Sequence, residues 1–252
     1  MTAVLADPVA ETRRILQAAD ERAVPLRAMG GIAIALIAPS IGHLEPPRVY
    51  HDIDLAAPSG APAVSHVLAD LGYEPARRFN TLNGSERLLF HDGEGRRIDV
   101  FIDTLRMCHT LRFGERLGLH PMTLSPADLL LSKLQIVELT PRDALDAAAL
   151  LADHQLTESG AAGIGLERVR QICCDDWGWW RTVDGNLGSL TEGWLAARSV
   201  ADPDGRQVLG TALARAAELR DGLGSWPKSA RWKMRSVIGE RMRWYDLPEE
   251  VR

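Results

Sequence analysis

A glycine pair and three acids occur along the chain in an order that limits the folds open to it. The glycines are Gly30 and Gly31, and the acids are Asp52, Asp54 and Asp99. Successive side chains of a strand point to opposite faces, so a strand over residues 48–57 would project Asp52 and Asp54 together. Their carboxylates would stand about 6–7 Å apart along such a strand. The pattern predicts a sheet with acids on one face.

The other side chains of this strand alternate with the acids and are expected to face a core. They are Val49, His51, Ile53 and Leu55. We therefore predict that His51 is a core or second-layer residue and not a metal ligand.

A hairpin is predicted to supply the third acid. Two strands, over residues 87–91 and 97–102, flank a turn rich in glycine and acidic residues at 92–95. In the second strand Ile98, Val100 and Ile102 share one face, and the other face carries Arg97, Asp99, Phe101 and Asp103. We prefer Asp99 to Asp103 as the third acid because Asp103 lies nearer the end of the strand.

The predicted secondary structure changes from alternating helices and strands to helices alone after Pro126. Before it, helices over 11–23, 32–37 and 62–71 alternate with the predicted strands. After it, breaker residues separate helices that are predicted over residues 127–139, 141–153, 166–174, 176–197, 205–220 and 229–244. We expect an α/β domain over residues 1–125, with a mixed β-sheet and flanking helices, followed by an all-helical domain over residues 126–252.

Bulk properties exclude some classes of protein. The net charge of −5 argues against a protein that coats nucleic acid along its whole surface. No stretch approaches the roughly 20 apolar residues that span a bilayer, and no basic region precedes the first apolar run, so no membrane partner and no secretory signal are expected. The three cysteines form no disulfide or zinc pattern, which favours buried thiols and a cytoplasmic location.

The ordered set of glycines and acids suits phosphate chemistry. Gly30 and Gly31, between a strand and a helix, let the backbone approach a phosphate, and the helix offers N–H donors to the same anion. Asp52 and Asp54 would bind Mg²⁺, which prefers carboxylate and phosphate oxygens. Asp99 would accept a proton from an attacking hydroxyl or help to hold a second metal ion. A lone Asp-x-Asp is common on solvated strands; the combination predicts metal-assisted transfer to or from a phosphate.

This order resembles the nucleotidyltransferase superfamily, whose core is related to polymerase beta. The resemblance covers roughly residues 10–150 and is greatest to the abortive-infection toxin-type branch, where Arg-x-Thr-x-Asp-Ile-Asp-Leu is typical; this chain has RVYHDIDL at 48–55. The helix with Lys133 and the following Arg142, Asp143 and Asp146 is similar to that branch as well. Segments 176–180 and 244–248 look similar to actinobacterial relatives, which implies no activity.

The resemblance implies a Mg²⁺-dependent enzyme, with Mn²⁺ as the alternative metal, that transfers a nucleoside monophosphate from ATP or another NTP. The acceptor hydroxyl would belong to RNA, including tRNA, to a protein or to a small molecule. Gly30, Gly31, Arg48 and Lys133 would bind the nucleotide, and Asp52, Asp54 and Asp99 would hold metal and perform catalysis. The toxin branch further implies a toxin–antitoxin role with an antitoxin partner.

Two departures from the family pattern keep an alternative open. Tyr50 stands where relatives carry a small hydroxyl residue, and Ile32 follows Gly31 where many carry serine. The alternative is a catalytically inactive module that binds nucleotide or RNA on the same fold. For Lys133, the alternative is a solvated side chain, with Asp143 and Asp146 capping or pairing locally.

The segment from Trp226 to Trp244 combines basic and aromatic residues. Its local charge is about +5, from Lys228, Arg231, Lys233, Arg235, Arg241 and Arg243 against Glu240. Cations between aromatic rings suit RNA or single strands. The favoured alternative is an amphipathic helix in which Trp232, Val237 and Trp244 share a buried stripe.

Overall fold

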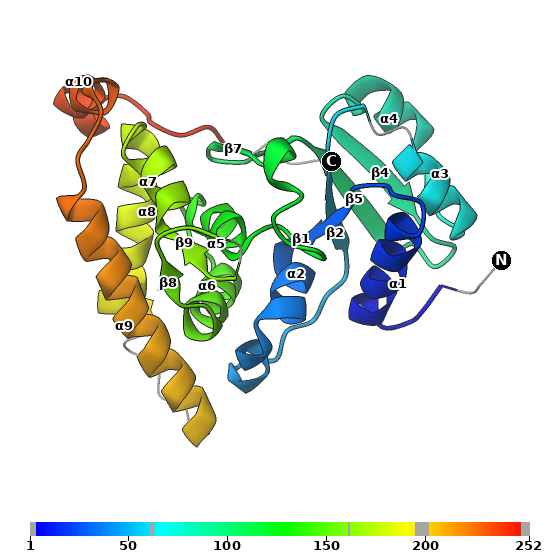
Figure 1. The fold of residues 1–252 in the computed structure, drawn as a ribbon, viewed down its shortest axis with the longest axis horizontal. Coiled ribbons are helices and arrows are strands. Elements are labelled where there is room, and N and C mark those ends of the chain that lie inside the picture. The colour runs from blue at the N-terminus through cyan, green and yellow to red at the C-terminus, as the bar shows by residue number, and fades with distance from the viewer. Residues whose placement is uncertain (1–3, 61–62, 161, 195–201, 248–252) are drawn as a thin grey trace. The chain divides into compact units, whose positions relative to one another are not determined.

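The structure is a computed structural model, which describes residues 4–60, 63–160, 162–194 and 202–247 (Figure 1). The chain divides into two compact units. The first comprises residues 1–37, 48–105 and 112–125, and the second comprises residues 38–47, 106–111 and 126–252. The second unit thus includes two short segments that a single cut near residue 125 assigns to the first.

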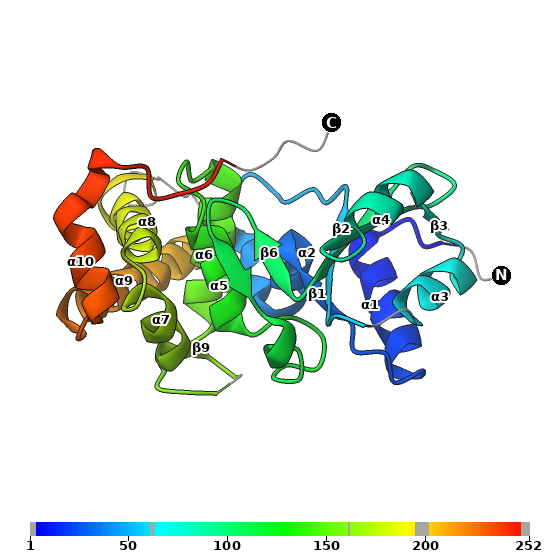
Figure 2. The ribbon, with the colours of Figure 1, turned by 90° about the horizontal axis from the view of Figure 1, so that it is seen from above.

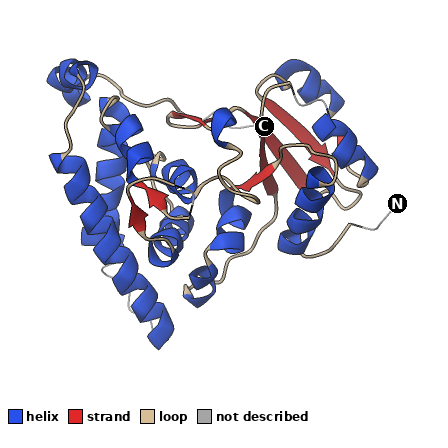
Figure 3. Cartoon of the chain, viewed as in Figure 1, coloured by secondary structure: helices blue, strands red, loops and turns tan. Residues whose placement is uncertain are grey.

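A five-stranded mixed sheet forms the centre of the first unit (Figure 3). Its strands are β1 (Arg27–Met29), β2 (Ile53–Ala57), β3 (Glu74–Pro75), β4 (Arg87–His91) and β5 (Arg97–Ile102). Their order across the sheet is β1-β2-β5-β4-β3. β2 and β5 run parallel and the other neighbours are antiparallel. Parallel strands need a long crossover, and the chain between β2 and β5 supplies one through two helices and the strands β3 and β4.

Helices flank this sheet. They are α1 (Pro8–Asp20), α2 (Gly30–Ile37), α3 (Ala63–Asp70) and α4 (Arg77–Asn83), each in contact with a strand, and the unit also contains the 3-10 turn η2 (Gly114–Arg116). The carboxylate of Asp7 caps α1 by accepting from the N–H groups of Val9 and Ala10. The core consists of fully buried side chains from α1, α3 and the sheet, among them Ile15, Leu68, Leu55 and Val100. A separate two-stranded sheet pairs β6 (Thr104–Arg106) with β7 (Thr110–Arg112).

The second unit is mainly helical. Its elements are η1 (Pro39–His43), α5 (Pro126–Leu134), α6 (Pro141–Asp153), β8 (Leu156–Thr157), β9 (Ile164–Gly165), α7 (Leu166–Cys173), α8 (Trp177–Gly188), η3 (Ser189–Trp194), α9 (Pro203–Ser225), α10 (Ala230–Ile238) and η4 (Gly239–Arg241). α6 is buried over residues 144–151 and packs against the long helix α9. α10 lies at the outside of this unit beside α8 (Figures 1 and 2).

The predicted class, a mixed α/β fold with a mixed sheet and C-terminal helices, is confirmed. The strand predicted over 48–57 was wrong at its start, because β2 begins only at Ile53. The neighbouring strands pair with β2 no earlier than Ile53, so the preceding residues have no ladder to join. Consequently His51 and Val49 are exposed, and the prediction that they face the core was wrong. Helix α4 was not predicted at all.

Three helix ends in the second unit also differ from prediction. The helix expected to reach residue 139 ends at Leu134, where the Asn186 amide donates to the carbonyls of Leu134 and Ile136, at 2.8 Å each. The last helix ends at Ile238 because Gly239 adopts a positive φ of 60°. The helix expected over 176–197 changes to a π-helical turn after Gly188, and residues 195–197 lie outside the described part.

Two predictions from bulk properties can be compared with the structure. Cys108, Cys173 and Cys174 are all free and buried, as predicted. No helix within the described ranges has both the length and the apolar character needed to cross a bilayer.

Candidate functional site

Asp54 and Asp99 occupy paired positions on the central parallel strands. The register of β2 and β5 aligns Asp54 with Asp99 and Ile53 with Ile98. Residues paired in this way project from the same face of a sheet, so both acids leave the face opposite the apolar core. Asp52 immediately precedes β2, and its exposed carboxylate accepts a hydrogen bond from Arg97 Nη2 at 3.1 Å. The three predicted acids therefore lie on or beside two adjacent strands.

Asp99 is buried and engaged by two arginines. Only 1% of its side chain is exposed. Arg87 donates from Nε to Oδ1 at 2.8 Å, with Nη2 2.6 Å from the same oxygen. Arg97 Nε lies 2.9 Å from Oδ2, an ion-pair distance without the direction of a hydrogen bond. Two guanidinium groups thus compensate the buried charge of Asp99, and Arg97 bridges Asp99 to Asp52.

Arg87 is in turn held between aromatic rings. Its guanidinium carbon lies 4.9 Å from the ring centre of Phe101 on β5 and 5.9 Å from that of Phe79 on α4. Such contacts fix the planar guanidinium in place. Sequence reasoning missed both arginines as partners of the acids. Arg97 stands two residues before Asp99 on the same face of β5. In the hairpin, Leu89 lies opposite Asp99, and Arg87 lies two residues from Leu89 on the same face. The two-residue spacing of these side chains could have indicated that both arginines lie near Asp99.

The glycine pair packs against site residues. Gly30 has a φ of +68°, and a Cβ atom there would lie 2.3 Å from Asp54 Oδ2. A Cβ atom on Gly31 would lie 2.8 Å from Arg48 Nη2 and 3.2 Å from Tyr50 Cε1. Position 30 favours glycine because its φ lies in the left-handed region and a side chain would displace the Asp54 carboxylate, whereas a side chain at Gly31 would only push the Arg48 guanidinium aside. The start of α2 is thereby brought against Asp54 and Arg48.

Arg48 and Tyr50 form one layer over Gly31. The Arg48 guanidinium carbon lies 5.4 Å from the centre of the Tyr50 ring. Tyr50 is thus the support of the arginine that the sequence predicted to bind nucleotide. The structure brings together the predicted residues Gly30, Gly31, Arg48 and Asp54 around the strand-to-helix turn.

Lys133 belongs to the second unit, where it forms a buried ion cluster. Its Nζ lies 2.9 Å from Asp143 Oδ1 and 2.9 Å from Asp146 Oδ2. Burial lowers the pKa of the ammonium, but the attraction of Asp146 and Asp143 outweighs it, so the net pKa is raised. Lys133 is therefore cationic. The local pairing of Asp143 and Asp146 that the alternative predicted is confirmed, whereas its prediction that Lys133 lies on a solvated face was wrong. Its role in nucleotide binding stays a prediction.

The donor set partly suits a divalent cation. Asp52 and Asp54 offer the hard oxygens that Mg²⁺ prefers, and Asp52 is accessible from solvent. Among the described residues, His43, Asp202 and Asp204 are the only group of three whose ligand atoms all lie within 4.8 Å of one another. The carboxylates of Asp52, Asp54 and Asp99 do not form such a group. Asp52 and Asp54 therefore fit as metal ligands, whereas Asp99 is held by arginines.

The cluster of His43, Asp202 and Asp204 has a structural explanation. Asp202 is the N-cap of α9, and its carboxylate accepts from the N–H groups of Asp204 and Gly205. His43 Nδ1 lies 3.4 Å from Asp202 Oδ2 at the exposed surface. Acids are stabilised at helix N-termini without a metal ion.

Two further features lie outside the acid cluster. Asp103, the second candidate for the third acid, has a φ of 56° and accepts a hydrogen bond from the Ser59 N–H, which gives it a role in the turn after β5.

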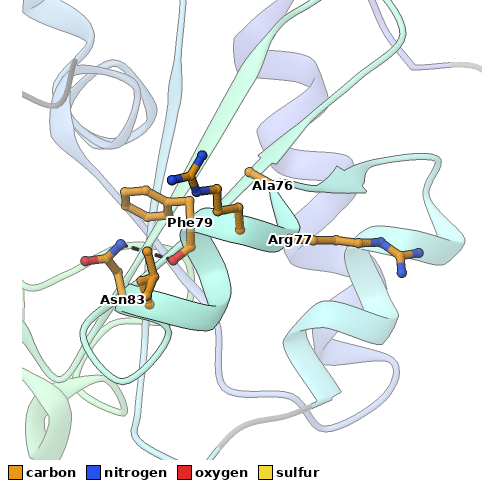
Figure 4. Close-up of a pocket in the computed structure, with 6 residues that line it drawn as sticks. Ala76, Arg77, Phe79 and Asn83 are labelled. Atoms are coloured by element: carbon orange, nitrogen blue, oxygen red, sulfur yellow. Dashed lines mark hydrogen bonds between the residues drawn. The ribbon is translucent and has the colours of Figure 1, made fainter.

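A shallow hollow of about 450 Å³ is formed by α4 (Figure 4). Its lining consists of Ala76, Arg77, Arg78, Phe79, Leu82 and Asn83. The predicted site residues, all within the described part of the chain, are not among them.

Comparison with known proteins gives no match to this chain, either among protein-family models or among curated protein sequences.

Proposed function

We propose that the chain is a Mg²⁺-dependent nucleotidyltransferase that moves a nucleoside monophosphate from an NTP to a hydroxyl acceptor. The observation that carries the proposal is the pairing of Asp54 with Asp99 on parallel strands, with Asp54 packed against the Gly30 turn. A structural Asp-x-Asp would not require a glycine with positive φ beside its second carboxylate. The resemblance of segment 48–55 to the superfamily supports the same reaction.

Each residue would contribute by position and charge. Asp52 and Asp54 would hold Mg²⁺, or Mn²⁺, which supplies charge neutralisation for the triphosphate. Arg48, supported by the Tyr50 ring beside Gly31, would contact phosphate oxygens at the start of α2. Lys133 is proposed as a second nucleotide contact on family resemblance alone. Positioning of the reactants would account for most of the rate.

Asp99 would need Arg97 to move before it accepts a proton. Its Oδ1 already receives two contacts from Arg87, and Oδ2 faces Arg97. Release of Arg97 would leave Oδ2 for the hydroxyl of the acceptor, while Arg87 keeps the carboxylate in position. The hydroxyl oxygen would then attack the α-phosphorus, and pyrophosphate would leave.

Label transfer tests the proposal. The full chain is incubated with Mg²⁺, each α-labelled NTP in turn, and RNA, protein or small-molecule fractions as acceptors. Asp52→Asn and Asp54→Asn should abolish transfer, whereas Asp70→Asn, which removes an exposed acid paired with Arg22 on the surface, should retain it. Full transfer by Asp54→Asn would exclude the assigned role.

A second candidate function is nucleotide binding without transfer. It is favoured by one observation: both oxygens of the proposed base, Asp99, contact guanidinium groups. In that case NTP should bind, no acceptor should become labelled, and Arg97→Gln should not restore transfer. A cytoplasmic location, a toxin-like role and an antitoxin partner belong to the proposal as implications of the family resemblance.

A further inference from the structure

Helix α10 presents its apolar side chains to solvent. Met234, Val237 and Ile238 are exposed, with 79% of Val237 accessible, and Met242 just beyond the helix is exposed too. Met234, Val237 and Ile238 are spaced three and four residues apart, so they lie on one face of the helix. We call the face made by Met234, Val237, Ile238 and Met242 the α10 face. The predicted burial of Val237 was therefore wrong.

Inward contacts hold this helix in place without the α10 face. Trp232 packs edge-on against Trp180, with ring centres 5.2 Å apart. Arg235 stacks over Trp177 at 4.8 Å and donates to the carbonyls of Gly239 and Met242 at 2.7 and 2.8 Å. The exposed aliphatic residues thus contribute little to folding and are held on an ordered support, which reduces the entropy lost on binding.

The six cations of this segment separate into two groups. Three serve the fold: Lys228 donates to the carbonyls of Leu223 and Trp226, Arg235 caps its own helix end, and Arg231 lies near Asp175 and Asp176. The other three, Lys233, Arg241 and Arg243, are exposed. They form no ion pair with any residue in the described part of the chain. The local acid, Glu240, is paired with Arg181 at 2.5 Å.

We propose that the α10 face binds an acidic amphipathic helix of a partner protein. An apolar stripe on the partner would cover Met234 and Val237, and its flanking carboxylates would meet Lys233, Arg241 and Arg243. Methionine and arginine are enriched at protein interfaces. This inference is independent of the proposed transfer activity.

Other occupants fit this face less well. RNA needs exposed rings for stacking, but Trp232 packs on Trp180 and Trp244 packs against Trp177, at 5.9 Å between ring centres. Stable attraction to an anionic bilayer typically uses clusters of about 4–8 basic residues, more than the three cations present. A second copy related by a two-fold axis would oppose cations to cations.

Peptide binding to the full chain tests the proposal. The probe is a synthetic helix of about 18 residues with leucine at helical spacing and glutamate elsewhere. Its control is a scrambled peptide of the same composition, and binding is followed by fluorescence anisotropy. We expect binding of the patterned peptide only, weakening as salt rises. Val237→Asp should weaken binding by about tenfold or more, and Lys233→Glu should weaken it as well, while Leu82→Asp on α4 should not.

The fold should survive these changes, because Val237, Lys233 and Leu82 are all exposed. An unchanged circular dichroism spectrum and thermal midpoint would establish this. Equal binding of the scrambled peptide, or unchanged binding by Val237→Asp, would overturn the proposal. The proposal would also be overturned if another ligand, and not the patterned peptide, bound in a way that depends on Val237. The ligands to test are vesicles of phosphatidylcholine and phosphatidylglycerol, single-stranded RNA, and a second copy of the chain, the last by sedimentation.

Discussion

Replacement of Arg97 by glutamine should raise the affinity of the acid cluster for divalent cations. Arg97 lies 3.1 Å from Asp52 Oδ2 and 2.9 Å from Asp99 Oδ2, so it holds the place of a counter-ion between two acids. A cation that binds Asp52 must compete with this guanidinium. Removing the guanidinium removes the competition and leaves the carboxylates as they are.

The size of the effect follows from the contact with Asp52. Both Arg97 and Asp52 are more than a third exposed, so their ion pair is expected to contribute about 0.5–1 kcal/mol, as surface pairs do. Loss of this competition at Asp52 corresponds to an increase of about 2- to 5-fold in the affinity for metal.

A titration with Mn²⁺, followed by electron paramagnetic resonance of the free ion, measures this affinity directly. Arg96→Gln is the matched control, because it removes the same charge from the adjacent position, where Arg96 contacts Asp92 and the carbonyl of Leu5. Arg97→Gln should bind more tightly than both the wild type and this control. Equal or weaker binding by Arg97→Gln, or an equal gain in Arg96→Gln, would refute the reasoning.

Three further predictions concern stability. Gly30→Ala should lower the free energy of unfolding by about 1–3 kcal/mol in urea titrations, because its backbone is left-handed and its Cβ would clash with a carboxylate, whereas Gly118→Ala, which has open space, should not. Burial lowers the pKa of His109 from 6.5 to about 4, so stability should fall by about 2 kcal/mol between pH 8 and pH 5, and His109→Gln should flatten this pH dependence. Lys133→Met should cost about 3 kcal/mol in the same urea assay, because Asp146 is fully buried and loses its ammonium; an unchanged midpoint would contradict this.

Much of the sheet could be predicted from the sequence because its strands carry strong local patterns. The limits of β4 and β5 match the predicted segments 87–91 and 97–102, where a turn of glycine and acidic residues separates two alternating runs. The start of β2 could not be predicted, because it depends on where β1 and β5 offer backbone partners. Local alternation continues past that point, but hydrogen bonding does not.

The candidate site shows the same division between local and distant determinants. Gly30 and Gly31 could be assigned to a strand-to-helix turn from the local sequence, whereas Arg48 was assigned to nucleotide binding by the family resemblance alone. The arginines on Asp99 and the aromatic support of Arg87 depend on strand register and on α4, whose sequence has no clear apolar period. Likewise, the inward packing of Trp232 follows from Trp180 on another helix, so the helix pattern alone placed Val237 on the wrong side.

The fate of the two ends of the triphosphate tests the central claim most directly. Parallel reactions of the full chain with α-labelled and γ-labelled NTP, over the same acceptors, distinguish nucleotidyl transfer from phosphoryl transfer. The account predicts that the α-label becomes attached to an acceptor while the γ-label appears in pyrophosphate, and that both events disappear in Asp54→Asn. Attachment of the γ-label to the acceptor, or release of pyrophosphate that survives in Asp54→Asn, would contradict it.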